Sequence, residues 1–172
     1  LVSLGYQYLE TDLRETSDGK IITFHDPNLK RITGANITIS ETKFSDIRMR
    51  RLPSREIIPT IDELLEEFPD SFFNMDLKVN QIEEKVLKKI NSHNALERVC
   101  LFSFNSKPIQ KITSFEPKIL TSMGISQWIM YTFFQKNNLS KLIQIPTNWK
   151  GIKVITTNYI DKIVRASCKE RD

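Results

Sequence analysis

Short apolar runs alternate with stretches of helical periodicity along most of the chain. Such runs are typical of buried strands, and apolar residues that repeat every three to four positions predict amphipathic helices. We expect strands at residues 8–13, 21–24, 72–78, 98–104, 118–122, 142–145 and 152–156, and helices at 60–68, 81–92, 107–114, 126–136 and 159–169. This alternation predicts repeated βα units built around a parallel sheet.

Residues 26–58 interrupt the alternation. They are polar and irregular and contain Pro27, Gly34 and Pro53, which predicts an excursion inserted after the second strand. The rest of the chain accommodates about five or six βα units, whereas a complete (β/α)₈ barrel typically takes about 250 residues. With 172 residues, we expect a single domain, residues 1–172, in which the barrel is incomplete.

Two acidic residues share one face of the first expected strand. Because side chains on a strand alternate with a period of two, Glu10 and Asp12 point the same way. Leu9, Thr11 and Leu13 point to the other side. Two like charges side by side on a buried face are unfavourable unless a positive group lies between them. Carboxylate oxygens are the hard ligands that magnesium and calcium prefer, so the pair predicts a divalent-cation site.

A later strand repeats this arrangement. Its polar positions are Asn74, Asp76 and Lys78, and its apolar positions are Phe73, Met75 and Leu77. His25 lies on the segment that returns from the first strand after the turn Ser17-Asp18-Gly19-Lys20. Three acids, one histidine and one lysine from neighbouring strand ends predict a site for a cation and a phosphate.

Composition narrows the class of protein. Hydrophobic residues make up 40% of the chain, enough for one core of ordinary size. The net charge of +4 is milder than the basic excess of a nucleic-acid-binding protein, so we expect no nucleic-acid partner. The longest apolar run, residues 125–134, is too short to span a bilayer. Cys100 and Cys168 form no close-spaced metal or redox motif, and Cys100 is predicted to be a small core residue.

The run at residues 8–27, with Glu10-Thr11-Asp12 and His25-Asp26, closely resembles the glycerophosphodiester phosphodiesterase domain family. Further matching positions are Leu29, Arg31, Thr33, Gly34 and residues 58–65, 74–78, 103–105 and 144–146. The resemblance implies a TIM-type (β/α)₈ barrel with an insertion after the His-Asp segment. It also implies hydrolysis of glycerophosphodiesters to glycerol 3-phosphate and an alcohol with Mg²⁺ or Ca²⁺, in lipid and glycerol metabolism.

The same resemblance implies roles for individual residues. Glu10 and Asp12 match the metal ligands of the family, and Asp76 falls where a third acidic ligand, most often Glu, is found. His25 matches one of two catalytic histidines, which serves as a general acid or base. Lys78 matches a lysine that stabilises the phosphoryl charge.

The chain departs from the family pattern at both ends. The first strand of the family, which carries a His-Arg-Gly motif and the second catalytic histidine, and its closing strands are not found in these residues. We therefore expect the isolated 172 residues to be inactive. Two alternatives stay open: a related lysophospholipase D-like enzyme acting on a lysolipid, and a phosphodiester-binding fragment without turnover. The expected partner is a small molecule, and neither membrane contact nor an oligomeric state is indicated.

Several other residues are weaker candidates for a functional role or are expected to be structural. Ser103 becomes a candidate substrate contact if Phe102 and Phe104 face the helices. For Asp26, a local structural role and support of the site are equally favoured. His93, at a helix end, is expected to be structural. The basic residues of the insertion are expected to be a solvated face and are Arg48, Arg50, Arg51 and Arg55. Residues 128–134 are expected to lie in the core or a subunit interface.

Overall fold

The computed structural model describes residues 2–53, 55–123, 142–143, 148–149, 152–153 and 157. The chain divides into two compact units, Leu1–Leu142 and Ile143–Asp172. The expected helices at 126–136 and 159–169 and the aromatic stretch at 128–134 lie outside the described residues. Among the helices that are described, none is long and apolar enough to cross a membrane.

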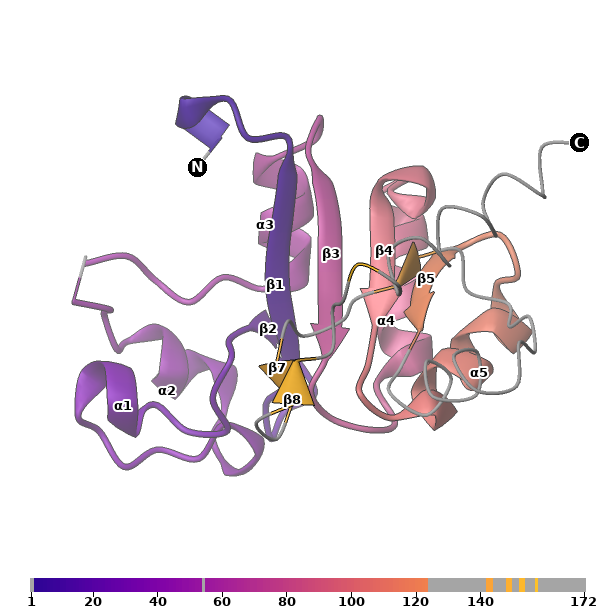
Figure 1. The fold of residues 1–172 in the computed structure, drawn as a ribbon. Helices are drawn as coiled ribbons and strands as arrows, with labels where there is room; N and C mark the ends of the chain where they lie inside the picture. The colour runs from indigo at the N-terminus through magenta and orange to yellow at the C-terminus, as the bar shows by residue number, and fades with distance from the viewer. Residues whose placement is uncertain are drawn as a thin grey trace, which may run out of the picture. The chain divides into compact units, whose positions relative to one another are not determined.

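A sheet with the order β2-β1-β3-β4-β5-β6 dominates the first unit (Figure 1). Its strands are β1 (Tyr8–Glu15), β2 (Ile21–Thr23), β3 (Phe72–Leu77), β4 (Val99–Phe102), β5 (Leu120–Met123) and β6 (Leu142–Ile143). β1, β3, β4 and β5 are mutually parallel, whereas β2 returns antiparallel to β1. Gly19, with φ of 78°, allows the tight turn between them. The prediction of βα units around a parallel sheet is confirmed for this sheet.

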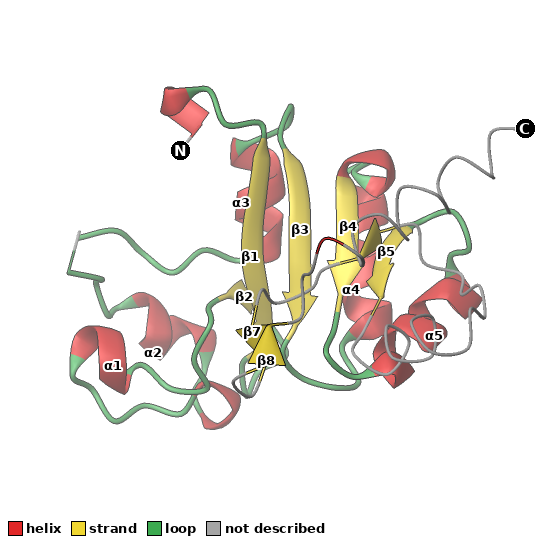
Figure 2. Cartoon of the chain, in the orientation of Figure 1, coloured by secondary structure: helices red, strands yellow, loops and turns green. Residues whose placement is uncertain are grey.

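Three helices pack against one face of the sheet, and Figure 2 shows α3 and α4 behind the strands. They are α3 (Ile61–Glu67), α4 (Glu83–Ser92) and α5 (Ser106–Phe115). The side chains that meet in this core include Leu13, Phe73, Met75, Leu77, Val99 and Leu101 from the strands and Ile61, Leu65, Val86, Ile90, Ile109 and Ile112 from the helices. Because odd-numbered residues of β1, β3 and β4 fill this core, the even-numbered residues face the other side of the sheet.

The start of α3 shows how local sequence positions an element. The Thr60 hydroxyl accepts from the Glu63 amide, and the Glu63 carboxylate accepts from the Thr60 amide, which forms a capping box. The helix ends at Glu67, and its C-terminal cap Phe68 is followed by Pro69, which cannot continue a helix. This helix follows directly from the sequence.

The inserted region is more ordered than its sequence suggests. It contains the short helices α1 (Lys30–Thr33) and α2 (Phe44–Arg48) and the 3₁₀ turn η2 (Ile39–Glu41); a further 3₁₀ turn, η1 (Val2–Leu4), precedes β1. A second hydrophobic cluster holds it together and consists of Ile22, Leu29, Ile39, Ile47 and Ile58. The expectation of an irregular excursion was therefore incomplete, because these apolar residues are scattered singly along the chain and form no periodic pattern.

In the second unit, β7 (Asn148–Trp149) and β8 (Ile152–Lys153) form a two-stranded antiparallel ladder. We had expected a parallel barrel strand over residues 152–156. The described part of that segment pairs instead with β7, four residues earlier, because the intervening residues are few enough for a hairpin.

Candidate active site

Asp12 and Asp76 lie side by side because β1 and β3 run parallel in a register that makes them direct partners. The Lys78 ammonium nitrogen lies 2.9 Å from Asp12 Oδ1 and 2.6 Å from Asp76 Oδ2. Only 12% of the Asp12 side chain and 6% of the Asp76 side chain are exposed. The main chain at Lys78 is held in place by a 3.1 Å hydrogen bond from its amide to the Leu13 carbonyl. The geometry therefore brings Asp12, Asp76 and Lys78 together at the ends of β1 and β3.

Burial dominates the electrostatics of these carboxyls. Burial raises the pKa of Asp76, although the neighbouring Lys78 opposes the shift. The pKa of Glu10, whose strand partner is Asn74, is also raised, first by burial and then by the charge of Asp12. The pKa of Lys78 is raised: burial opposes this, but hydrogen bonds to Asp76 and Asp12 outweigh it. The surroundings thus favour the neutral form of two carboxyls on this face, those of Glu10 and Asp76. They favour the charged form of the Lys78 ammonium, which lies between Asp12 and Asp76.

His25 lies just beyond β2 and is tied to the same strand. The Phe24 amide donates to the Asp12 carbonyl at 2.9 Å, which brings the His25 segment to the carboxylate face. The imidazole Nδ1 lies 2.7 Å from Asp26 Oδ1, and 65% of the His25 side chain is exposed. The other nitrogen, Nε2, is therefore the one left to meet a ligand.

Asp26 supports His25 and is itself held from the other side. Arg31 of α1 donates through Nε to Asp26 Oδ2 at 2.6 Å and through Nη2 to Oδ1 at 3.2 Å. These hydrogen bonds, first from Arg31 and then from His25, lower the pKa of Asp26 to about 2. Asp26 therefore stays ionised and orients the imidazole, and its support of a catalytic site stays a prediction.

Arg14 is a residue that the sequence interpretation missed. Its Nε donates to the His25 carbonyl at 2.9 Å. Partial burial lowers the pKa of Arg14, and the negative charges of Asp12, Asp26 and Asp76 oppose this shift. All three acids therefore interact electrostatically with the Arg14 guanidinium. A signal was present, since Arg14 continues the period-two series of Glu10 and Asp12 and must share their face.

The structure also shows which way the side chains around Ser103 face. Ser103 was a candidate on the condition that Phe102 and Phe104 face the helices, but Leu101 packs in the helix-side core and Phe102 is the strand partner of Asp76. The reason is that β4 is apolar at every position, so no polar residue marks its faces. The Ser103 hydroxyl donates to the Leu77 carbonyl at 3.3 Å. Its role as a substrate contact stays a prediction.

The structure instead places Phe104 beside the charged cluster. Its ring centroid lies 5.5 Å from the Lys78 nitrogen, and 55% of the residue is exposed. An exposed aromatic ring next to buried charges supplies an apolar wall for a bound molecule.

The donor set of this face suits a hard divalent cation. Glu10, Asp12 and Asp76 offer carboxylate oxygens, and the buried Asp76 Oδ1 has no hydrogen-bond partner among the described residues. Within that part of the chain, however, no three His, Cys, Asp or Glu side chains converge on a common point for a metal. The positive charge between Asp12 and Asp76 is the Lys78 ammonium, which the sequence interpretation had assigned to the phosphate alone.

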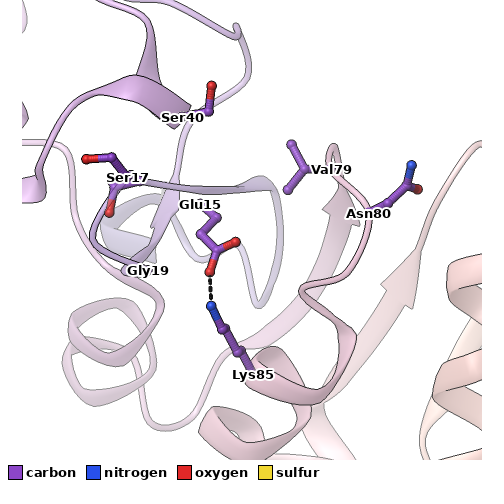
Figure 3. Close-up of a pocket in the computed structure, with 8 residues that line it drawn as sticks. Glu15, Ser17, Gly19, Ser40, Val79, Asn80 and Lys85 are labelled. Carbon is purple, nitrogen blue, oxygen red and sulfur yellow. Dashed lines mark hydrogen bonds and ion pairs between the residues drawn. The ribbon is translucent and has the colours of Figure 1, made fainter.

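A small cleft opens at the same edge of the sheet, beyond the ends of β1 and β3 (Figure 3). It has a volume of about 340 Å³ and is lined by Glu15, Thr16, Ser17, Gly19, Ser40, Val79, Asn80 and Lys85. Its two charged residues, Glu15 and Lys85, form an ion pair with each other. Because none of the predicted site residues lines it, the cleft is separate from the carboxylate cluster.

His93 lies where a structural histidine was expected, at the C-terminal cap of α4. Its Nε2 lies 2.9 Å from Asp62 Oδ1 of α3. Cys100 is buried, with 7% exposed, and burial raises the pKa of its thiol to about 11. The expectation that Cys100 is a small core residue is therefore confirmed.

Comparison with known proteins identifies the family. The chain belongs to the glycerophosphoryl diester phosphodiesterase family, whose family model matches residues 2–158. Members of this family are phosphoric diester hydrolases, and the family in general depends on divalent metals.

Individual relatives agree with this assignment. The chain is 27% identical over 165 residues to the probable glycerophosphodiester phosphodiesterase 2 of Mycobacterium tuberculosis, covering 89% of this chain and 62% of that protein. It is 33% identical over 108 residues to lysophospholipase D GDPD1 of Homo sapiens, covering 54% of this chain and 34% of that protein. The chain therefore spans less than two thirds of the length of these relatives.

Solved structures confirm the fold. The glycerophosphodiester phosphodiesterase of Agrobacterium tumefaciens matches with a TM-score of 0.65 and 24% identity, covering 71% of this chain and 56% of that one. A putative glycerophosphodiester phosphodiesterase of Galdieria sulphuraria matches with a TM-score of 0.65 and 18% identity, covering 70% and 53%. These neighbours are TIM-barrel proteins, and the sheet described above is consistent with part of such a barrel.

Proposed function

We propose that the protein hydrolyses glycerophosphodiesters to glycerol 3-phosphate and an alcohol at the face formed by β1 and β3. The observation that supports this most is the joint placement of Asp12, Asp76 and Lys78, with His25 tied to the same strand through the 2.9 Å Phe24–Asp12 hydrogen bond. Phosphodiester cleavage needs positive charge at the phosphoryl oxygens and a proton carrier at a reacting oxygen. This face offers both.

The proposal assigns the cation site to Glu10, Asp12 and Asp76. Their oxygen donors, together with an Asp76 Oδ1 that has no hydrogen-bond partner in the described part of the chain, favour Mg²⁺ or Ca²⁺ over a softer metal. When bound, such an ion supplies Lewis-acid stabilisation of the negative charge that develops on the phosphoryl group. The ligands are these carboxylates, and Lys78 gives up one of its two acid contacts when the substrate binds.

The remaining steps are carried out by side chains of this protein. Lys78 contacts a phosphoryl oxygen as a fixed positive charge. The Nδ1–H of His25 donates to Asp26 at 2.7 Å, so Nε2 is the nitrogen that exchanges a proton with the attacking or leaving oxygen as general acid or base. Asp26 keeps the imidazole in one tautomer and orientation.

A two-substrate assay of the full-length protein tests the proposal. Release of glycerol 3-phosphate from glycerophosphocholine is measured beside release of inorganic phosphate from glycerol 3-phosphate. We expect turnover of the diester and none of the monoester. The proposal fails if the protein cleaves only the monoester or neither substrate.

A lysolipid is the second candidate substrate. Phe104, 55% exposed beside Lys78, offers an apolar surface next to the proposed phosphoryl position, and the human relative is named a lysophospholipase D. A ratio of kcat/KM that favours lysophosphatidylcholine over glycerophosphocholine supports this candidate. The opposite ratio supports the glycerophosphodiester.

A further inference from the structure

Arg14 connects the strand that carries the acids to the segment that carries His25. Its Nε donates to the His25 carbonyl at 2.9 Å, and it shares a strand face with Asp12 by the period-two rule. One further hydrogen bond, from the Phe24 amide to the Asp12 carbonyl at 2.9 Å, joins the same two segments. The main chain at His25 is therefore held to β1 on both sides of the Phe24–His25 peptide bond.

Arg14 is not needed to neutralise the acids around it. Asp26 is paired with Arg31 through two hydrogen bonds, and Lys78 pairs with both Asp12 and Asp76. Among the described residues, the only hydrogen bond that the Arg14 side chain makes is the one to the His25 carbonyl. The hydrogen bond of the Arg14 side chain goes to a neutral carbonyl, and the acids around it already have partners, so we assign Arg14 a geometric role.

The imidazole needs two restraints to be held in one place. Asp26 fixes the rotation of the ring through Nδ1 at 2.7 Å. It restrains the main chain of His25 only indirectly, because Asp26 is the adjacent residue and is itself held through its side chain by Arg31 of α1. A direct restraint on the main chain of His25 comes from β1, where Arg14 is the side chain that donates to the His25 carbonyl.

We propose that Arg14 is a positioning residue that fixes His25 relative to Asp12 and Asp76 for proton transfer. This inference rests on the proposed function of His25. A group that positions a proton carrier affects the rate of the chemical step more than substrate binding, and a small displacement costs up to about 10²-fold in rate.

A double-mutant cycle in the full-length protein tests the proposal. Arg14→Met removes the donor, Arg14→Lys keeps a donor and a charge, and His25→Ala removes the proton carrier. We expect Arg14→Met to lower kcat for glycerophosphocholine by about 10- to 10²-fold with little change in KM. Arg14→Lys should recover part of that loss. In the His25→Ala background, Arg14→Met should cause no further loss, because the two residues act as one unit.

The control is Arg50→Met, since Arg50 is exposed in the insertion, and it should leave kcat unchanged. An equal loss from Arg14→Met with and without His25 would overturn the proposal, as would a raised KM at unchanged kcat, which would indicate direct substrate binding. If Arg14→Met does not fold, the same cycle is run with Arg14→Lys, and additivity again overturns the proposal. Absence of any wild-type diester hydrolysis would mean instead that the proposed function has failed.

Discussion

Asp12 and Asp76 are direct partners across two parallel strands, and the two carboxylates share a single ammonium group. Side chains this poorly exposed are costly to leave charged without a partner, since removing one member of a buried ion pair strands the others. Lys78 therefore has a structural role in this arrangement as well as the proposed catalytic one. The two roles are separable by measuring stability and turnover independently.

Replacing Lys78 should destabilise the fold. Lys78→Met leaves two neighbouring carboxylates uncompensated, and we expect a loss of about 3 kcal/mol in the free energy of unfolding, measured by urea denaturation at neutral pH. Lys85→Met is the matched control, because Lys85 pairs with Glu15 while 54% of its side chain is exposed. That exposed pair should contribute about 0–1 kcal/mol. Equal losses in the two variants would show that the Lys78 cluster is effectively solvated.

The two histidines of the chain should behave differently. His25→Ala should lower turnover of glycerophosphocholine by about 10²–10⁴-fold, the usual cost of losing a general acid or base. The His93 side chain pairs with Asp62 between α3 and α4, so His93→Ala should affect stability and leave turnover close to wild type. A loss of turnover in His93→Ala with a normal His25→Ala would show that the wrong histidine has been assigned.

Asp26 should make folding stability depend on pH in the acid range. Its pKa is about 2 in the folded protein against an ordinary value of 3.8. A carboxyl with a lowered pKa stabilises the fold fully above the unfolded value, and the contribution is lost as pH falls from 3.8 toward 2. The difference in unfolding free energy between wild type and Asp26→Asn should therefore be constant from about pH 7 to about pH 5 and shrink below about pH 4. A difference that does not vary with pH would contradict the Arg31 and His25 contacts of Asp26.

Much of the sheet could be predicted because its pattern is locally encoded. Phe73, Met75 and Leu77 alternate with polar residues, so burial of one face assigned the other to Asp76 and Lys78. The capping box of Thr60 and Glu63 is a local signal in the same sense. By contrast, β4 is apolar on both faces, and its faces could be assigned only from the register with β3.

The contacts that organise the candidate site were less accessible to prediction. The hydrogen bond from Arg14 to the His25 carbonyl joins a side chain to a main-chain atom eleven residues away. Because every residue has a main-chain carbonyl, the residue type at position 25 does not predict this bond. The position of Lys78 between two acids depends on the strand register, which the sequence does not state. The core of the insertion depends on apolar residues such as Ile39 and Ile47 that are far apart in sequence and lack a period.

The most direct test of the central claim is the metal dependence of diester hydrolysis by the full-length protein. Glycerol 3-phosphate release from glycerophosphocholine is followed after chelation and again after Mg²⁺ or Ca²⁺ is added, in wild type and in the triple variant Glu10→Gln, Asp12→Asn, Asp76→Asn. We expect chelation to abolish turnover in wild type and the added cation to restore it. The triple variant should stay inactive at any cation concentration while it remains folded by circular dichroism. Wild-type turnover that persists through chelation, or a folded triple variant with normal turnover, would contradict the assignment of this carboxylate face as the active site.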